Sequence, residues 1–391
     1  MLKIKFNKSG NKLETTHIKE LDGLRALFII IIVWYHIWQQ SWLEPKIGAF
    51  SIDGIIRSGS ICVDALILIS GFCLFLPYAR KMEYDDKLPS TKNFYINRIA
   101  RIVPSYLFAI LVTLIFFVLP NKEYSSISFA LKDIFSHLFF VHNLVPEVLY
   151  DTKIIGVLWT VAVEVQLYLF FPLIAKAFMK KPILTYISTV SFSLLSCFLI
   201  SQNFDTISSS FWVNNTLTFI CVFMNGILGA WIYMKITKKY PSNKFLPILF
   251  TIISMALVLL YTPICNFRMS YGDEQKWQID FRYLLSFFYL AFIISTILAS
   301  SWYRKLFNNR VMKFIAVISY NMYIYHQFIA TKLVEYKIPS WQGEELPNVA
   351  GDSSWQIKYV IICVIIILLV ATITTYLIEK PASNKIKSLM K

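Results

Sequence analysis

Long apolar segments alternate with short polar connections along the whole chain, and each apolar segment holds roughly the 20 residues that a helix needs to cross a bilayer. The predicted spans cover residues 21–42, 60–78, 102–119, 154–176, 183–200, 211–234, 246–264, 280–300, 314–334 and 357–378. No connection between them is long enough to form a soluble domain. The pattern predicts an all-α polytopic membrane protein, one domain over residues 1–391 with about ten transmembrane helices.

The composition supports a membrane location and indicates an orientation. Of the 391 residues, 57% are hydrophobic and 16% are charged, whereas soluble domains carry about 25% charged residues. If both termini are cytoplasmic, the inner side carries 26 of the 38 Lys and Arg residues, as membrane proteins require. We therefore expect residues 1–20 and 380–391 to be cytoplasmic tails. The net charge of +15 is spread over the inner connections and not over one soluble face, which argues against a nucleic-acid partner.

Two further features of the chain indicate structure and not chemistry. The six cysteines are scattered without a CxxC pair, so we interpret them as small apolar side chains and expect no metal site. The segment 131–145 is too short to span the membrane and contains His137 and His142. It could re-enter the membrane, but an interfacial helix on the outer side is the favoured interpretation.

The first span, "LDGLRALFIIIIVWYHIW", contains two residues that are costly in a membrane, Arg25 and His36. On an α-helix their spacing brings both side chains to the same face, about 16 Å apart along the axis. Ionisable groups at membrane depth are functional candidates by default. Asp64 in the second span is expected at a depth similar to His36, so the two could pair, with the carboxylate setting the tautomer of the imidazole. Independent groups with water or backbone partners are the alternative.

Two arginines precede the third span in "NFYINRIARIVPSY". Arg98 and Arg101 are three residues apart, so they share a helical face, and they lie at the cytoplasmic level of Arg25. Guanidinium groups bind phosphates through paired hydrogen bonds. Anchoring by positive charge explains either arginine of this pair, but it does not explain Arg25 inside a span.

Polar side chains also follow one face of the fourth and ninth spans. Glu164 is flanked one turn away on each side by Thr160 and Tyr168, next to Trp159 in "GVLWTVAVEVQLYLFFP". In the ninth span the residues on one face are Ser319, Tyr323 and His326, although His326 alone could be a hydrogen-bonded structural histidine. Glu379, in the closing "YLIEKP", could pair with an arginine at the cytoplasmic mouth.

These stretches together resemble the acyltransferase 3 family of integral membrane acyltransferases, which modify bacterial surface glycans and similar acceptors. The matching pieces are "LDGLRA" with the spacing from Arg25 to His36, "CVDALILISGF", "RIAR", "LWTVAVEVQLYLF", "SYNMYIYH" and "IEKP". They occur in the family's order and cover nearly the whole chain. The sequence departs from the family after Asp64, where a bulkier aromatic run is usual.

The resemblance implies transfer of an acyl group, with acetyl as the default, from cytoplasmic acyl-coenzyme A to a hydroxyl of a glycan or lipid-linked saccharide. The protein would lie in the plasma membrane of a bacterium and need no metal. Arg25, Arg98 and Arg101 would bind the donor, and His36 would act as general base or as nucleophile. The catalytic candidates are His36, Asp64, Glu164 and His326, and the supporting candidates are Trp159, Thr160, Tyr168, Ser319, Tyr323 and Glu379.

Some family members add an extracytoplasmic hydrolase-like domain that completes the transfer, and we expect a separate partner protein or direct access of the acceptor here. A glycan-lipid transporter or flippase without acyl transfer is the alternative function. It would more often show inverted repeats and broken helices, which we do not find in this sequence. A proton-coupled channel would not explain the cytoplasmic arginines.

Overall fold

The computed structural model describes residues 17–44, 46–47, 50–204, 209–241 and 243–390. Most of the expected cytoplasmic N-terminal tail, residues 1–16, lies outside the described residues. The helices are α1 (Lys19–Ser41), α2 (Asp53–Arg57), α3 (Cys62–Tyr84), α4 (Thr91–Thr113), α5 (Ile127–Leu138), α6 (Pro146–Asp151), α7 (Trp159–Lys180), α8 (Pro182–Gln202), α9 (Ser209–Val213), α10 (Thr216–Lys239), α11 (Leu246–Ser270), α12 (Glu274–Leu298), α13 (Ser301–Arg304), α14 (Arg310–Glu335), α15 (Ser353–Thr374) and α16 (Lys380–Leu389).

Shorter elements join or extend these helices. Two π-helical turns, η2 (Leu114–Val118) and η6 (Thr375–Glu379), continue α4 and α15. The 3-10 turns η1 (Gly59–Ile61) and η4 (Gly156–Leu158) precede α3 and α7, and η3 (His142–Leu144) follows α5. Strands β1 (Lys46–Ile47) and β2 (Phe50–Ser51) form a small antiparallel pair.

The predicted membrane-protein fold is confirmed, with one distinction between the spans. Each predicted span is mostly helical, and nine helices of the described chain are long and apolar enough to cross a membrane. The predicted span 314–334 forms α14, which has the necessary length but does not belong to those nine. Its polar side chains Ser319, Asn321 and His326 are buried in the protein, as is usual for polar groups at membrane depth.

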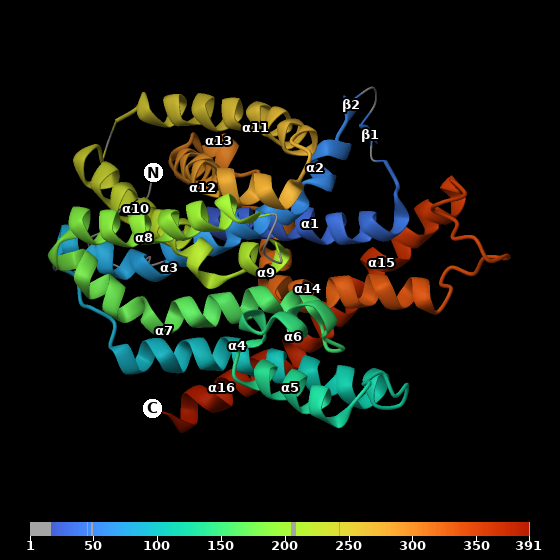
Figure 1. Ribbon diagram of the computed structural model, residues 1–391. Coiled ribbons are helices and arrows are strands. Elements are labelled where there is room, and N and C mark those ends of the chain that lie inside the picture. The colour runs from blue at the N-terminus through green and yellow to red at the C-terminus, as the bar shows by residue number, and fades with distance from the viewer. Residues whose placement is uncertain (1–16, 45, 48–49, 205–208, 242, 391) are drawn as a thin grey trace.

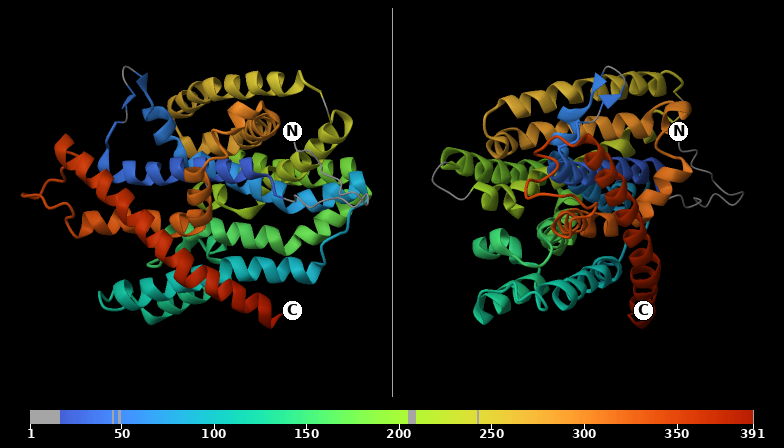
Figure 2. Two further views of the ribbon diagram at one scale, coloured as in Figure 1. Left: turned by 180° about the vertical axis from the view of Figure 1, so that it is seen from behind. Right: turned by 90° about the vertical axis from the view of Figure 1, so that its right-hand side faces the viewer.

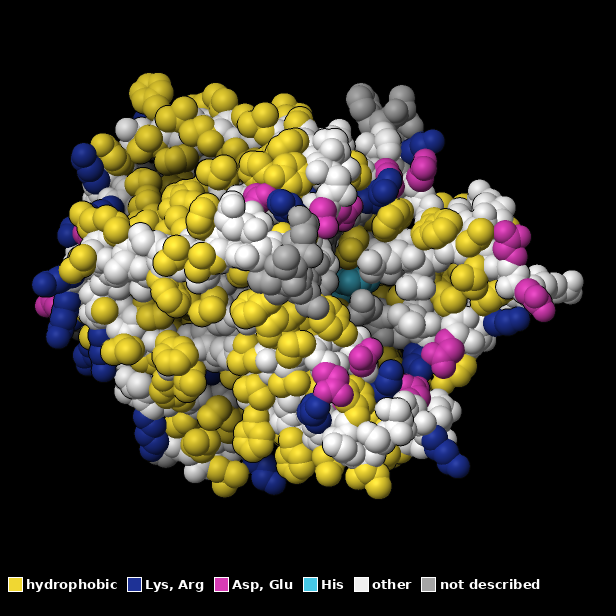
Figure 3. Space-filling view, viewed as in Figure 1, with side chains coloured by type: hydrophobic (Ala, Val, Ile, Leu, Met, Phe, Trp, Pro, Cys, Tyr) yellow, Lys and Arg dark blue, Asp and Glu magenta, His cyan; other side chains and the backbone are white. Residues whose placement is uncertain are grey.

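The helices lie side by side in a bundle (Figures 1 and 2), and α14 packs against α1 in its interior. Helices α8 and α11 lie at the periphery and expose apolar side chains such as Phe192 and Leu259. In Figure 1, α1 begins and α16 ends at the left-hand end of the bundle. Figure 3 shows a face with hydrophobic side chains across its middle and Lys and Arg gathered toward that same end. The chain ends and the Lys and Arg residues thus share the end of the bundle that is predicted to be cytoplasmic.

We expect accessibility labelling to place the connection 335–356 outside the cell and α16 inside. A membrane-impermeant maleimide should label Glu345→Cys in intact cells and Asn384→Cys only after permeabilisation; both native side chains are exposed. The six native cysteines provide the background labelling control. The opposite pattern would contradict the orientation, and with it the cytoplasmic donor site.

Two glycines let α3 and α10 approach until their backbones touch. A Cβ on Gly71 would lie 2.4 Å from the carbonyl oxygen of Phe223, and one on Gly226 would lie 2.1 Å from that of Leu68. Small residues permit such contacts between membrane helices, where close packing replaces the hydrophobic effect as the source of stability. The contact sets the position of α3, which contributes Ser70 to the cavity described below.

Candidate active site

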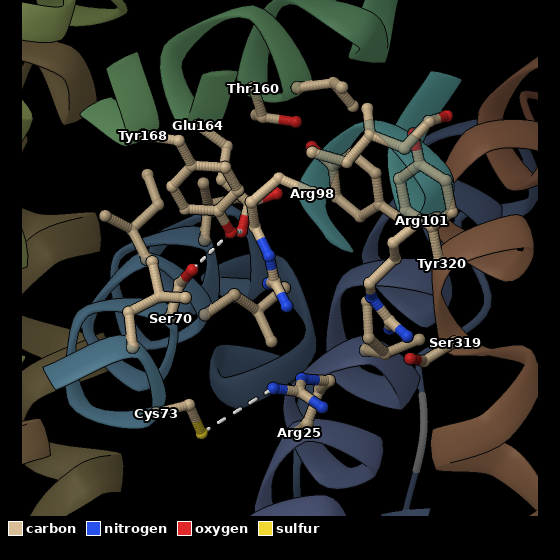
Figure 4. A pocket seen from close by; sticks show the side chains of 18 residues that line it. Arg25, Ser70, Cys73, Arg98, Arg101, Thr160, Glu164, Tyr168, Ser319 and Tyr320 are labelled. Atoms are coloured by element: carbon tan, nitrogen blue, oxygen red, sulfur yellow. Dashed lines mark hydrogen bonds between the residues drawn. The ribbon is translucent and has the colours of Figure 1, made fainter. Parts of the chain in front are cut away.

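Side chains from α1, α3, α4, α7 and α14 surround one cavity of about 870 Å³, counting the open space at its mouth. Figure 4 shows its polar side chains pointing inward from these helices. Eight residues predicted from the sequence line it, namely Arg25, Arg98, Arg101, Thr160, Glu164, Tyr168, Ser319 and Tyr323. Ser70 and Cys73 from α3 and Tyr320 from α14 complete its polar wall. Periodicity on four separate helices therefore predicted residues that tertiary packing brings together.

The three arginines converge on this cavity from two helices (Figure 4). The guanidinium of Arg25 lies 3.9 Å from the Cys73 sulfur and 3.8 Å from an oxygen of Asp22. Within the described chain neither Arg98 nor Arg101 forms an ion pair, and Arg98 stands over the ring of Tyr168 at 5.7 Å. Cationic groups without acidic partners are suited to binding an anionic ligand.

Gly23, in the same motif as Arg25, allows the close helix packing that positions Arg25. A Cβ on Gly23 would lie 1.8 Å from the carbonyl oxygen of Phe307, so only glycine lets the start of α1 approach the segment before α14. The contact is reinforced by an ion pair of 3.2 Å between Glu20 and Arg304. The "LDGLRA" motif thus contains both the packing residue and the cavity arginine.

A chain of hydrogen bonds crosses the cavity wall between α3 and α7. Tyr168 donates to the Glu164 carboxylate, and the hydroxyl of Ser70 lies 2.5 Å from that of Tyr168. Since Tyr168 has one proton and donates it to Glu164, Ser70 donates to Tyr168. The chain orients the Glu164 carboxylate. Ser70 was not predicted, because a single serine in an apolar helix has no distinctive pattern.

His36 does not line the cavity but lies beyond it, next to His326. The rings of His36 and His326 are 4.9 Å apart, and the ring of His326 is 5.4 Å from that of Tyr323, which lines the cavity. His326 is fully buried, and its Nδ1 lies 2.7 Å from the carbonyl oxygen of Tyr323. Its Nδ1 therefore carries the proton, and its Nε2, which has no hydrogen-bond partner in the described structure, is a free acceptor.

The predicted pairing of Asp64 with His36 is wrong, because Asp64 pairs with Arg282. The Asp64 carboxylate lies 3.3 Å from Nε of Arg282, and both side chains are fully buried. Arg282 also donates to the carbonyl oxygen of Val213 at 2.7 Å and to Thr218, and stands over the ring of Phe219 at 3.9 Å. A buried guanidinium needs a counter-charge, and the Asp64 carboxylate provides it for Arg282 of α12. Arg282 lies in the predicted span 280–300 but was not predicted as a site residue.

Two supporting candidates, Glu379 and Trp159, do not line the cavity. Glu379 accepts a hydrogen bond of 2.7 Å from Asn321, and no ion pair with an arginine is found for it in the described part of the chain. The π-helical turn η6 carries Glu379 to this position, as such turns often do at functional sites. Trp159 packs against Phe219 at 5.9 Å and away from the cavity, so it supports the Arg282 site.

His137 and His142 belong to a buried structural cluster and not to the cavity. Their rings stack at 3.9 Å, and His137 lies 3.1 Å from the Asp133 carboxylate. Burial raises the pKa of Asp133, but hydrogen bonds from His137 and other donors outweigh it and hold the pKa below its usual range. Burial and the adjacent His137 lower the pKa of His142 to about 3. Among the described residues, no group of three or more His, Cys, Asp or Glu could hold a metal ion.

Comparisons with known proteins agree on one family. A family model described as "Acyltransferase domain" matches residues 18–375. The protein named "Putative O-acetyltransferase SACOL0978" from Staphylococcus aureus (strain COL) is 28% identical over 348 residues, which are 83% of this chain and 53% of that protein. O-acetyltransferase OatA from Staphylococcus aureus (strain NCTC 8325 / PS 47) is 26% identical over 343 residues, again 83% of this chain and 53% of that protein. The chain spans about half the length of these curated relatives. No solved structure matches the chain significantly.

Proposed function

We propose, because this chain belongs to the acyltransferase 3 family, that it is a membrane-embedded O-acyltransferase. The donor is cytoplasmic acyl-coenzyme A, with acetyl as the default acyl group, and the acceptor is a hydroxyl of a cell-surface glycan or a lipid-linked saccharide in the bacterial plasma membrane. The observation that carries the proposal is the convergence of Arg25, Arg98 and Arg101 on one cavity (Figure 4). A proton-coupled channel would give no reason for this cluster of arginines.

Charge and length both favour this donor. Its phosphates would bind the three guanidinium groups, which hold phosphate oxygens by charge-assisted hydrogen bonds. Its thin pantetheine arm would extend along α1 toward His36, about 16 Å further along the helix axis. Glu164 and Tyr323 line the cavity that this arm would enter.

The transfer needs a base at the thioester, and His36 is the candidate. The acceptor hydroxyl oxygen would form the new bond to the thioester carbonyl carbon while its proton passes to the imidazole. The bond between carbon and sulfur would then break, and the coenzyme A sulfur would take up a proton and leave as the thiol. His36 is half-buried, so an acceptor could approach it, whereas His326 behind it is fully buried.

Removal of either α4 arginine should weaken donor binding. We expect Arg98→Ala and Arg101→Ala each to reduce affinity for acetyl-coenzyme A by about 1–3 kcal/mol, or roughly 5- to 150-fold, because a charge-assisted contact is lost. Isothermal titration calorimetry on purified protein measures this directly. Lysine at either position should restore binding only in part, because it lacks the planar fork.

Lys92→Ala is the matched control, because Lys92 is on the same helix and exposed but does not line the cavity. If both arginine variants bind donor normally and only lose activity, the arginines do not hold the donor. If the native protein shows no saturable binding of acyl-coenzyme A, the result favours the alternative function, a glycan-lipid transporter or flippase. Mass spectrometry of surface glycans from cells with and without the gene then tests the acceptor.

A further inference from the structure

Two glutamine side chains that the proposed mechanism does not use lie beside the ring of His36. Its Nδ1 lies 2.7 Å from Oε1 of Gln39, one turn further along α1, and 3.3 Å from Nε2 of Gln327 on α14. Gln39 in turn donates to the hydroxyl of Tyr35 at 3.0 Å. In this orientation Gln39 turns its amide nitrogen to Tyr35 and its amide oxygen to the imidazole.

The shorter contact decides which imidazole nitrogen carries the proton. An amide oxygen can only accept, so at 2.7 Å the Nδ1 of His36 donates to Gln39. Nε2 of Gln327 is also a donor, so its 3.3 Å approach to the protonated Nδ1 is a contact and not a hydrogen bond. A neutral imidazole has one proton, and its other nitrogen is then an acceptor. We propose that Gln39 is a positioning residue that keeps the proton of His36 on Nδ1 and leaves Nε2 as the nitrogen that accepts the acceptor's proton. The inference rests on the proposed role of His36 and names the group that sets its tautomer.

Gln39 is an uncharged partner of His36, and the other groups around the ring supply no counter-charge to it. The titratable groups in contact with the ring are His326 from α14, at 4.9 Å, and Tyr35 from its own helix, at 4.8 Å. The nearby cation Arg57 stands over Trp38 at 5.1 Å. Within the described chain His36 forms no ion pair with any helix packed against α1. Gln39 carries no net charge, so it orients the imidazole while stabilising its charged form less than a carboxylate would.

This assignment predicts a specific effect of charge at position 39. Gln39→Glu keeps the acceptor oxygen but places a carboxylate against Nδ1, which favours the protonated ring by about one pH unit or more. We expect the rate at which diethyl pyrocarbonate modifies His36, a reaction of the unprotonated ring, to have its pH midpoint raised by that amount. Peptide mass spectrometry across a pH series measures the midpoint without any need for transfer activity.

Gln342→Glu is the control, because it adds the same charge at an exposed position of the connection between α14 and α15, and Gln342 forms no hydrogen bond to the ring in the described structure. Equal midpoints for Gln39→Glu and Gln342→Glu, or no shift for Gln39→Glu, would overturn the assignment. Gln39→Leu should lower kcat for acetyl transfer at least about tenfold, with an unchanged KM for the donor. Unchanged kcat in Gln39→Leu would also overturn it. If the native protein transfers no acyl group, the proposed function fails while the midpoint shift still tests the contact.

Discussion

His36→Ala should insert and fold normally and bind acyl-coenzyme A, but its rate of acyl transfer should fall by roughly 10²–10⁴-fold, the usual contribution of a general base. Of the arginines proposed to bind the donor, Arg25 lies about three helical turns away on the same helix and the other two lie on α4, so donor affinity should not change. His36→Gln should be equally inactive, since an amide cannot take up a proton at neutral pH. Calorimetry and a transfer assay on the same preparation separate binding from turnover.

His17→Ala is the control for this experiment, because His17 is an exposed histidine that contacts Asp22 and lies outside the cavity. It should transfer acyl groups at the native rate. Near-native transfer by His36→Ala would show that His36 is structural. The catalytic candidate would then be Glu164, which lines the cavity, or His326.

Breaking the buried pair of Asp64 and Arg282 should destabilise the protein more than any other single change proposed. We expect Asp64→Asn and Arg282→Gln each to lower the free energy of unfolding by about 3–5 kcal/mol, because each leaves an unpaired charge in the protein interior. The effect should be visible as a lower Tm in detergent. Glu147→Gln is the control, because it also breaks an ion pair, with Lys132, but both of these side chains are exposed, so no charge is left unpaired in the interior.

Replacement of both partners tests whether the pair serves stability or chemistry. Asp64→Leu with Arg282→Met should recover part of the stability lost in either single variant, because no charge remains unpaired. The recovered protein should still transfer acyl groups if Asp64 is structural. Asp64→Asn with native Tm and no transfer would instead support the catalytic role that the sequence predicts for Asp64.

Hydrophobic patterning predicts the spans because the bilayer imposes one length and one polarity on every crossing. Helical periodicity also predicts which residues of one helix share a face. Ser319 and Tyr323 on α14 line the cavity together, as do Glu164 and Tyr168 on α7. Such predictions succeed because the geometry of a helix is local, so spacing along the chain determines direction.

The partners of those residues depend on how the helices pack. Depth alone suggests that His36 could pair with Asp64, but packing places Arg282 of α12 beside Asp64 and His326 of α14 beside His36. The sequence by itself determined the spans, the grouping of arginines at the end predicted to be cytoplasmic and the face on which each polar residue lies. Only the tertiary structure decided which faces meet, because a side chain's depth is a property of one helix, whereas its partner is chosen by rotation and packing against other helices.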